Sequence, residues 1–182
     1  MDKVLNIALI GASGVVGQKI LQLLDKKDIY VDTLFPLGSS SVGQKVNFQN
    51  NDHIIEDLES FDPSLANITI FSAGSSVARK HARKFVEAGS YVIDLSSEFR
   101  YEDEVPLIIP EINGDILENL SEPTLIANPN CSTSQLLMAL KPIHDKYGIE
   151  FINIAISWIV WEEKSSYRIL FICNVLGPNC CR

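Results

Sequence analysis

The sequence predicts an α/β fold built on a doubly wound parallel sheet. Short apolar segments of strand length alternate with stretches of helical spacing, and each predicted strand opens into a loop of small and polar residues. The first of these loops is also rich in glycine. Because such a sheet binds ligands beside the carboxyl ends of its strands, we expect the loops to face one crevice.

Composition narrows the class of ligand. Of the 182 residues, 46% are hydrophobic and 21% are charged, which is typical of a globular protein. The formal net charge is -8 and no basic stripe is present, which argues against a nucleic-acid-binding surface. The expected ligands are small molecules that bind local positive groups.

Targeting and metal-binding signals are missing from the sequence. No stretch approaches the roughly 18 uninterrupted apolar residues of a membrane span, and Met1–Val4 runs into a predicted strand without a secretory signal. We therefore expect a cytoplasmic protein that makes no membrane contact. The four cysteines form neither a disulfide framework nor a zinc pattern, so no metal site is expected. His81 and His144 are predicted to be surface groups.

The first predicted strand, Val4–Ile10, leads through a glycine turn into a helical stretch, Gln18–Leu24. In this context Gly11 permits the tight turn, Gly14 lets a pyrophosphate approach the backbone, and Gly17 lets the helix pack against the strand. The spacing is Gly-x-x-Gly-x-x-Gly, which is less common than Gly-x-Gly-x-x-Gly. A tight turn without a ligand is the alternative.

The second predicted strand, Tyr30–Leu37, ends in a loop of small and hydroxyl-bearing residues that includes Ser40 and Ser41. A site for NAD places Asp or Glu near the end of this strand to bind the ribose 2′-hydroxyl. Here Asp32 lies near the beginning of the strand instead. We therefore predict NADP over NAD, with a ligand-free serine loop as the alternative.

The next elements repeat the alternation. We predict a strand over Ile68–Phe71, a helix over Val77–Ala88, a strand over Tyr91–Leu95 and a short strand over Leu107–Asn113. Arg100 is the one cation among the loop ends, and its planar guanidinium could bind a phosphate or carboxylate at two points. A solvated surface arginine is the alternative.

Cys131 stands between a further predicted strand, ending at Ala127, and a helical stretch, Gln135–Leu140. A helix start favours an anion because its backbone amides are unpaired and the helix dipole is positive there. The thiolate is the nucleophilic form of cysteine, so Cys131 is a candidate nucleophile. A buried structural cysteine is the alternative.

These motifs together resemble the aspartate-semialdehyde dehydrogenase family over roughly the first 157 residues. The most specific block is Asn128-Pro129-Asn130-Cys131-Ser132-Thr133, which differs from the block expected of N-acetyl-glutamyl-phosphate reductases, the alternative enzyme with a similar plan. The other matching blocks are Gly11–Gly17, Phe71–Gly74, Val92–Asp94 with Ser96-Ser97 and Phe99-Arg100, Val105–Leu107, and Pro110–Asn113.

The resemblance implies a Rossmann-like NADP-binding domain of a homo-oligomeric enzyme that reduces L-aspartyl 4-phosphate to L-aspartate 4-semialdehyde in lysine, threonine and methionine biosynthesis. It implies that Cys131 forms a thioester, that Arg100 binds the substrate phosphate or inorganic phosphate, and that Asn130 orients substrate or cofactor. Ser40-Ser41 stand where many members have Arg-Ser for the 2′-phosphate. The residues implied to bind the cofactor are Gly11, Ser13, Gly14, Val15, Val16, Ser40, Ser41, Ser72, Ala73 and Gly74.

The sequence departs from the family after Ser157. We predict an NADP-binding domain over residues 1–130, the start of a second, α+β catalytic and dimerisation domain over 131–157, and a divergent tail over 158–182. The Gln, Arg and general-base His expected in the family's second domain are not found there. We hypothesise a change of reading frame just after Ser157. A catalytically inactive nucleotide-binding fragment, or an interaction module that docks through its apolar tail, are the alternatives to the enzyme.

Overall fold

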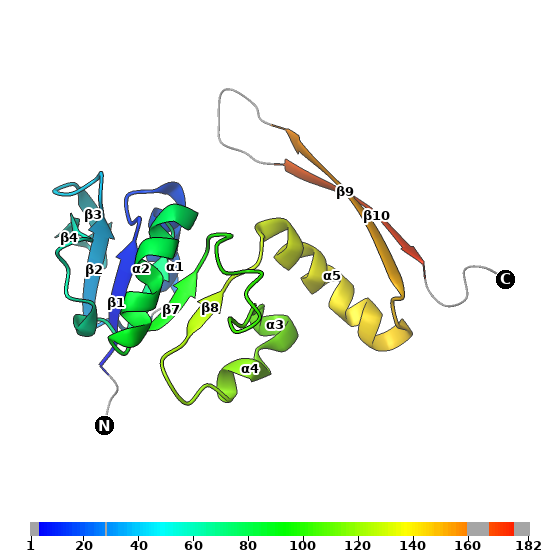
Figure 1. Ribbon diagram of the computed structural model, residues 1–182. Coiled ribbons are helices and arrows are strands. Elements are labelled where there is room, and N and C mark those ends of the chain that lie inside the picture. The colour runs from blue at the N-terminus through cyan, green and yellow to red at the C-terminus, as the bar shows by residue number, and fades with distance from the viewer. Residues whose placement is uncertain (1–3, 28, 160–167, 177–182) are drawn as a thin grey trace. The chain divides into compact units, whose positions relative to one another are not determined.

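The computed structural model describes residues 4–27, 29–159 and 168–176, and the chain forms two compact units, Met1–Asn130 and Cys131–Arg182. The first unit contains a six-stranded sheet in the order β5-β2-β1-β6-β7-β8 (Figure 1). Every neighbouring pair is parallel, which confirms the predicted doubly wound sheet. The strands are β1 (Asn6–Ile10), β2 (Thr33–Gly38), β5 (Glu56–Asp57), β6 (Ile68–Phe71), β7 (Tyr91–Asp94) and β8 (Leu125–Ala127).

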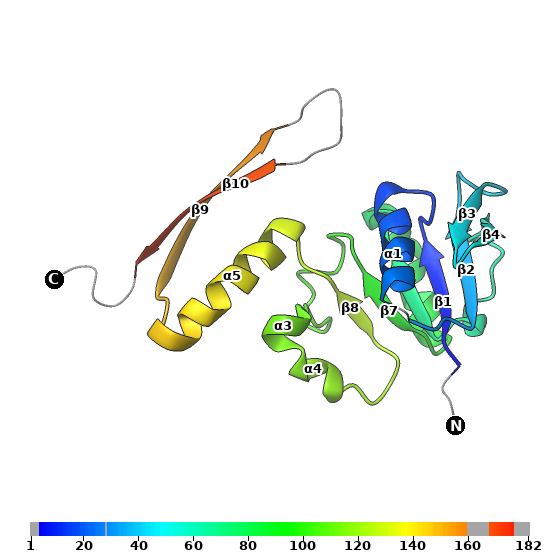
Figure 2. The same cartoon turned by 180° about the vertical axis from the view of Figure 1, so that it is seen from behind.

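Two helices cover opposite faces of this sheet. Helix α2 (Ser75–Glu87) lies in front of the sheet in Figure 1, and helix α1 (Val15–Lys26) lies in front of it in the reverse view of Figure 2. Strand β1 contributes side chains to the hydrophobic core on both faces of the sheet, because successive side chains of a strand point to opposite faces. Ala8 and Ile10 belong to the core cluster that contains residues of α2, while Ile7 and Leu9 belong to the cluster that contains Leu21 of α1. A strand buried on both faces explains the continuous apolar run.

The hydrophobic spacing of α2 fixes which side of the helix is buried. Its buried residues, Ala78, His81, Ala82 and Phe85, follow the i, i+3, i+4, i+7 pattern of an amphipathic helix. His81 is only 5% exposed, so the prediction that it is a surface group is wrong. His81 lies on the apolar side of the helix. It has polar neighbours in the sequence, so the sequence around it does not indicate burial.

Burial shifts the protonation of His81. Its Nε2 lies 3.4 Å from Oε1 of Glu59, which is also paired with Lys80. Removal from water lowers the pKa of His81, and the nearby carboxylate opposes this effect without cancelling it. His144, in contrast, is exposed as predicted.

Several short elements are not evident from the sequence. An antiparallel hairpin, β3 (Lys45–Phe48) with β4 (Asn51–Ile54), follows β2 and turns at residues 49–50 with positive φ. Strand β5 adds an edge to β2 over only two residues. The remaining short elements of the first unit are the 3₁₀ helix η1 (Pro63–Leu65), α3 (Pro110–Asn113) and α4 (Asp115–Glu118).

The prediction of a strand over Leu107–Asn113 is wrong. Leu107 forms only an isolated parallel bridge with Ala127, and Pro110 begins helix α3. Proline lacks a backbone N–H and has a fixed φ near -65°, so it suits the first position of a helix and cannot continue a hydrogen-bonded strand.

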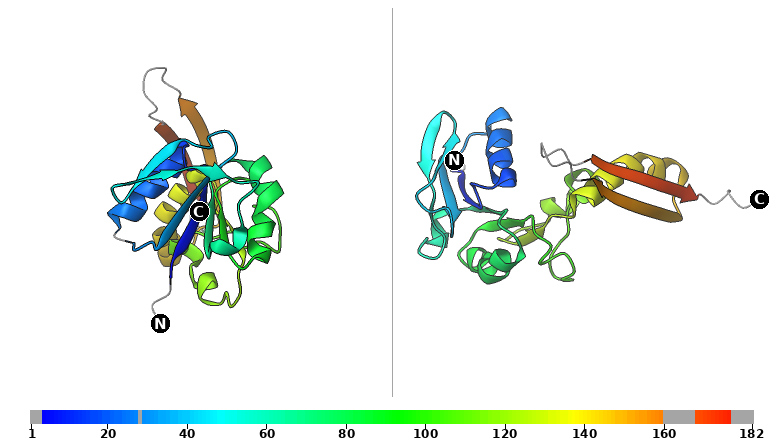
Figure 3. Two further views of the ribbon diagram at one scale, coloured as in Figure 1. Left: turned by 90° about the vertical axis from the view of Figure 1, so that its left-hand side faces the viewer. Right: turned by 90° about the horizontal axis from the view of Figure 1, so that it is seen from above.

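The second unit begins with helix α5 (Cys131–Tyr147) and continues into β9 (Phe151–Ile159). Gly148 ends the helix in a left-handed conformation, with φ 71° and a hydrogen bond from its N–H to the carbonyl of His144. β9 pairs antiparallel with β10 (Arg168–Leu176), as the views of Figure 3 also show. The predicted divergent tail therefore includes a strand. Its residues 160–167 and 177–182, with Trp161, Cys180 and Cys181, lie outside the described residues.

None of the helices among the described residues is long and apolar enough to cross a membrane.

Replacing Gly17 with alanine tests the packing of α1 on the end of β1. A Cβ at this position would lie 2.3 Å from the carbonyl oxygen of Gly11, which is backbone and cannot move aside cheaply. We expect Gly17→Ala to lower the free energy of unfolding of the full chain by about 1–3 kcal/mol in urea titrations. The control Gln22→Ala, on the exposed side of the same helix, should change it by less than about 0.5 kcal/mol. Equal effects of the two variants would contradict the contact.

Acid sensitivity tests the burial of His81. The unfolded state binds a proton near pH 6.5 and the folded state only at lower pH, so stability is fully present above pH 6.5 and is lost as the pH falls toward the lowered folded pKa. We expect the melting temperature to fall between pH 7.5 and 5, with a smaller fall in His81→Gln. His144→Gln, at an exposed position, should behave like the parent chain. If the melting temperature of His81→Gln fell with pH as steeply as that of the parent chain, His81 would not be the source of the acid sensitivity.

Candidate cofactor site and nucleophile

A cavity of about 230 Å³ lies at the carboxyl ends of β1, β2 and β6. After β2 the chain crosses back over β1 to reach β6 on its other side, so β1 marks the point where the strand order reverses. Doubly wound sheets bind their ligands at this point. The lining residues are Ile10, Gly11, Ser13, Gly14, Gly38, Ser39, Ser40, Ser41, Ser72, Ala73 and Val77.

Glycines shape the first loop of the cavity. Gly11 has φ 83°, a conformation that L side chains rarely adopt, and a Cβ there would meet the backbone of Ser72 at 3.1 Å. Gly14 is the residue before α1, and no side chain caps this helix start. The first-turn amides of α1 and its positive dipole end are therefore suited to bind an anion.

Serine side chains supply the other walls. The hydroxyl of Ser72 donates to the carbonyl oxygen of Ile10 at 2.7 Å, which joins the ends of β6 and β1. Ser41 is buried, and a Cβ at Gly38 would lie 2.6 Å from its Oγ. Ser39 and Ser40 are exposed. The wall at the end of β2 thus presents two accessible hydroxyl groups.

The lining fits a dinucleotide phosphate group. Of its eleven residues, none has an ionisable side chain, so no carboxylate there repels an anion. Backbone amides, a helix start and serine hydroxyls are hydrogen-bond donors that bind phosphate. Because Gly11 and Gly14 have no side chain, a ligand can approach the backbone closely at these two positions.

The structure brings seven of the ten predicted cofactor residues to this cavity. Val15 and Val16 lie instead in the first turn of α1, where their side chains are 84% and 52% exposed. Gly74 precedes α2 with φ 88° and does not line the cavity. Sequence reasoning did not single out Ile10, Gly38, Ser39 and Val77, although the first three lie at the predicted strand ends.

The two-residue strand β5 brings two carboxylates near the same edge of the sheet. β5 places Glu56 and Asp57 beside Leu37 and Gly38 of β2. Neither acidic residue lines the cavity, and Oδ1 of Asp57 accepts a hydrogen bond from the backbone N–H of Glu59 at 3.3 Å.

Arg100 lies at the ends of β7 and β8. Its Nε donates to the carbonyl oxygen of Asn128 at 2.9 Å, and its Nη2 donates to that of Leu95 at 3.1 Å. The loop that carries it is also tied to α2 by the Arg79–Glu98 ion pair, with Nη2 2.9 Å from Oε2. The hydrogen bond from Arg79 lowers the pKa of Glu98, which keeps this anchor ionised. Arg100 is thus half-buried and held between two loops.

Cys131 is the first residue of helix α5, as the sequence predicts, and it is exposed. The preceding residue, Asn130, is also exposed and ends the first unit. The candidate nucleophile therefore stands at the start of a 17-residue helix.

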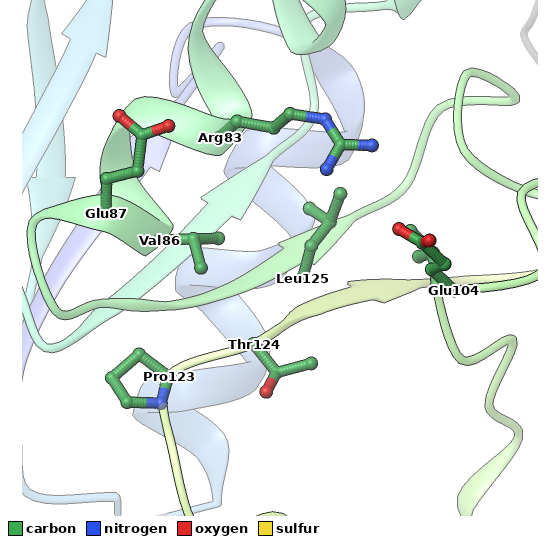
Figure 4. Close-up of a pocket in the computed structure, with 8 residues that line it drawn as sticks. Arg83, Val86, Glu87, Glu104, Pro123, Thr124 and Leu125 are labelled. Atoms are coloured by element: carbon green, nitrogen blue, oxygen red, sulfur yellow. The ribbon is translucent and has the colours of Figure 1, made fainter.

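A second cavity, of about 250 Å³, lies between α2 and β8 (Figure 4). Figure 4 shows Arg83, Val86 and Glu87 from α2 on one side and Pro123 to Leu125 on the other. The guanidinium of Arg83 is already paired with Glu102. This cavity contains none of the predicted site residues, so it is not a candidate for the cofactor.

Comparison with known proteins identifies the first unit. The family model described as "Semialdehyde dehydrogenase, NAD binding domain" matches residues 6–120, more than half of the chain. The chain belongs to this family. The family description assigns a nicotinamide cofactor to the domain.

Individual proteins that the chain resembles agree with this family assignment. The chain is 46% identical over 156 residues to the aspartate-semialdehyde dehydrogenase of Shewanella sp. (strain DB6705), covering 85% of this chain and 46% of that protein. It is 43% identical to that of Legionella pneumophila, covering 85% and 45%. The structure of Vibrio cholerae aspartate semialdehyde dehydrogenase II complexed with ASA matches with a TM-score of 0.80 and 42% identity, over 84% of this chain and 50% of that one. The chain spans about half the length of these curated relatives.

Proposed function

We propose that this chain carries the cofactor site and the nucleophile of an NADP-dependent aspartate-semialdehyde dehydrogenase, which reduces L-aspartyl 4-phosphate to L-aspartate 4-semialdehyde. The observation that carries the proposal is the cavity at the ends of β1, β2 and β6, followed later in the same chain by a cysteine at a helix start. The domain family and the named relatives support the class of reaction.

The first unit, Met1–Asn130, is the proposed cofactor-binding domain, and α5 opens the proposed catalytic domain. Gly11, Ser13 and Gly14 would hold the cofactor pyrophosphate at the start of α1, with Ser72 and Ala73 across the cavity. Val15, Val16 and Gly74 would contribute backbone groups at the two helix starts. When bound, the nicotinamide supplies the hydride that converts an acyl group to the aldehyde.

The choice of NADP over NAD rests on the end of β2. The exposed residues Ser39 and Ser40 line the cavity, and the buried Ser41 also lines it. The carboxylates of β5 are neighbours in the sheet but do not line the cavity. A wall of hydroxyl donors without a carboxylate suits a 2′-phosphate better than a 2′-hydroxyl.

The chain's own residues have distinct roles in the proposed reaction. The thiolate of Cys131 attacks the acyl carbon of aspartyl phosphate, the phosphate leaves, and the acyl group stays on Sγ as a thioester. The guanidinium of Arg100 binds the phosphoryl group, and Asn130 orients the substrate beside the nucleophile. Covalent attachment splits one difficult step into two easier ones.

A carboxylate at Ser40 tests the cofactor preference. Repulsion between Ser40→Glu and a 2′-phosphate should weaken NADPH binding by about tenfold or more and affect NADH less, as measured by fluorescence titration of the full chain. The control Ser121→Glu changes an exposed residue before β8, at the opposite end of the parallel sheet, and should leave both affinities unchanged. Equal losses for NADPH and NADH would contradict the assignment of the 2′-phosphate.

Removal of the thiol tests the nucleophile. We expect the full chain to reduce NADP with aspartate semialdehyde only when phosphate is present, and Cys131→Ala to slow this reaction by at least about 10³-fold. NADPH affinity should not change, because Cys131 does not line the cavity. Cys173→Ala in β10 is the matched control and should keep the parent rate.

Other outcomes would overturn parts of the proposal. Binding of NADPH without any turnover would contradict the activity of this chain and favour a nucleotide-binding role alone. Turnover that survives in Cys131→Ala would remove the thioester from the reaction.

A further inference from the structure

The carboxyl group of Asp94 is fully buried at the end of β7, and the proposed reaction does not use it. Its Oδ1 accepts from the backbone N–H of Ser96 at 3.1 Å, and its Oδ2 accepts from the Ser96 hydroxyl at 2.7 Å. A carboxyl group is costly to bury unless such bonds satisfy it. Because both donors belong to the residue two positions later, the carboxyl fixes the turn by which the chain leaves β7.

Ser96 extends this arrangement along the loop. While its hydroxyl donates to Asp94, the same oxygen accepts from the backbone N–H of Glu98 at 3.1 Å. The Glu98 side chain is held in turn by Arg79 of α2. The loop between β7 and Arg100 is therefore fixed by its own side chains and by a helix.

Arg100 closes the network into a ring. It donates to the carbonyl oxygens of Leu95 and Asn128, while the N–H of Asn128 donates to the backbone carbonyl of Asp94 at 2.8 Å. The ring joins the ends of β7 and β8, three residues before Cys131 in the chain. These two bonds use Nε and Nη2 of the guanidinium.

We propose that Asp94 and Ser96 are positioning residues that hold Arg100 against Asn128, so that its guanidinium is oriented for the phosphoryl group before the substrate binds. This inference rests on the proposed function for the role of Arg100. An arginine side chain is long and flexible, and fixing it in advance removes the cost of ordering it when the ligand binds. The backbone carbonyls hold two of its nitrogens without neutralising its charge.

Inorganic phosphate is the probe for a test on the full chain. Removal of the hydroxyl in Ser96→Ala should weaken phosphate binding by about tenfold, as followed by titration calorimetry. Ser96→Thr keeps a hydroxyl and should restore the affinity. NADPH affinity should stay constant in both variants, because neither Asp94 nor Ser96 lines the cofactor cavity. The control Ser97→Ala removes the neighbouring hydroxyl, which pairs with Ser75 at 3.2 Å, and should have no effect on phosphate.

Hydrogen exchange of the Asn128 amide gives a second readout that does not require a ligand. We expect this amide, which is bonded to Asp94, to exchange faster in Ser96→Ala and at the parent rate in Ser97→Ala. Unchanged exchange in Ser96→Ala, unchanged phosphate affinity, or failure of Ser96→Thr to restore it would overturn the inference. If the parent chain binds no phosphate, the role of Arg100 in the proposed function fails, and the exchange rates alone decide the positioning role.

Discussion

The close approach of helix α1 to the end of β1 is the contact on which the proposed site depends. Gly17 packs against the backbone of Gly11 with no room for a Cβ, which places the start of α1 at the carboxyl edge of the sheet. Gly11, with its positive φ, and Gly14 at the start of α1 both line the cavity. A side chain at Gly17 would push helix α1 away from the end of β1, and a side chain at Gly11 would meet the backbone of Ser72. Either change would disturb the proposed anion-binding position.

The sheet also decides how the remaining loops are combined. Parallel pairing brings every strand's carboxyl end to one edge, and the order of the strands divides these ends into two groups. The ends of β1, β2 and β6 share the cavity, whereas the ends of β7 and β8 are joined through Arg100. The proposed roles follow this division, with hydroxyls and amides for the cofactor and a cation for the substrate phosphate. The proposed cofactor cavity needs no charged side chain of its own, because backbone dipoles would supply the attraction for a phosphate.

Hydrogen bonds to backbone groups join the strand ends of the second group, and the Arg79–Glu98 ion pair ties their loop to α2. Asp94 and Asn128 each use a backbone group to join β7 to β8, and Arg100 adds two bonds to carbonyl oxygens. Buried polar groups that are fully satisfied rigidify their surroundings, since any rearrangement would leave one of them unpaired. In the proposed mechanism, the segment that leads to Cys131 therefore starts from a backbone held in place at Asn128.

The sequence by itself determined the strand–helix alternation, the glycine turn and the position of Cys131 at a helix start, because these depend on local periodicity and on residues with special backbone preferences. Only the tertiary structure decided the rest. β5 is two residues long and is stabilised by its neighbour β2, the apolar run before Pro110 lies beside β8 without becoming a strand, and His81 is buried because its helical position faces the sheet. The same holds for the pairing of Asp94 with Ser96 and of Arg100 with Asn128, since contacts between separate loops are set by strand order, which no local pattern records.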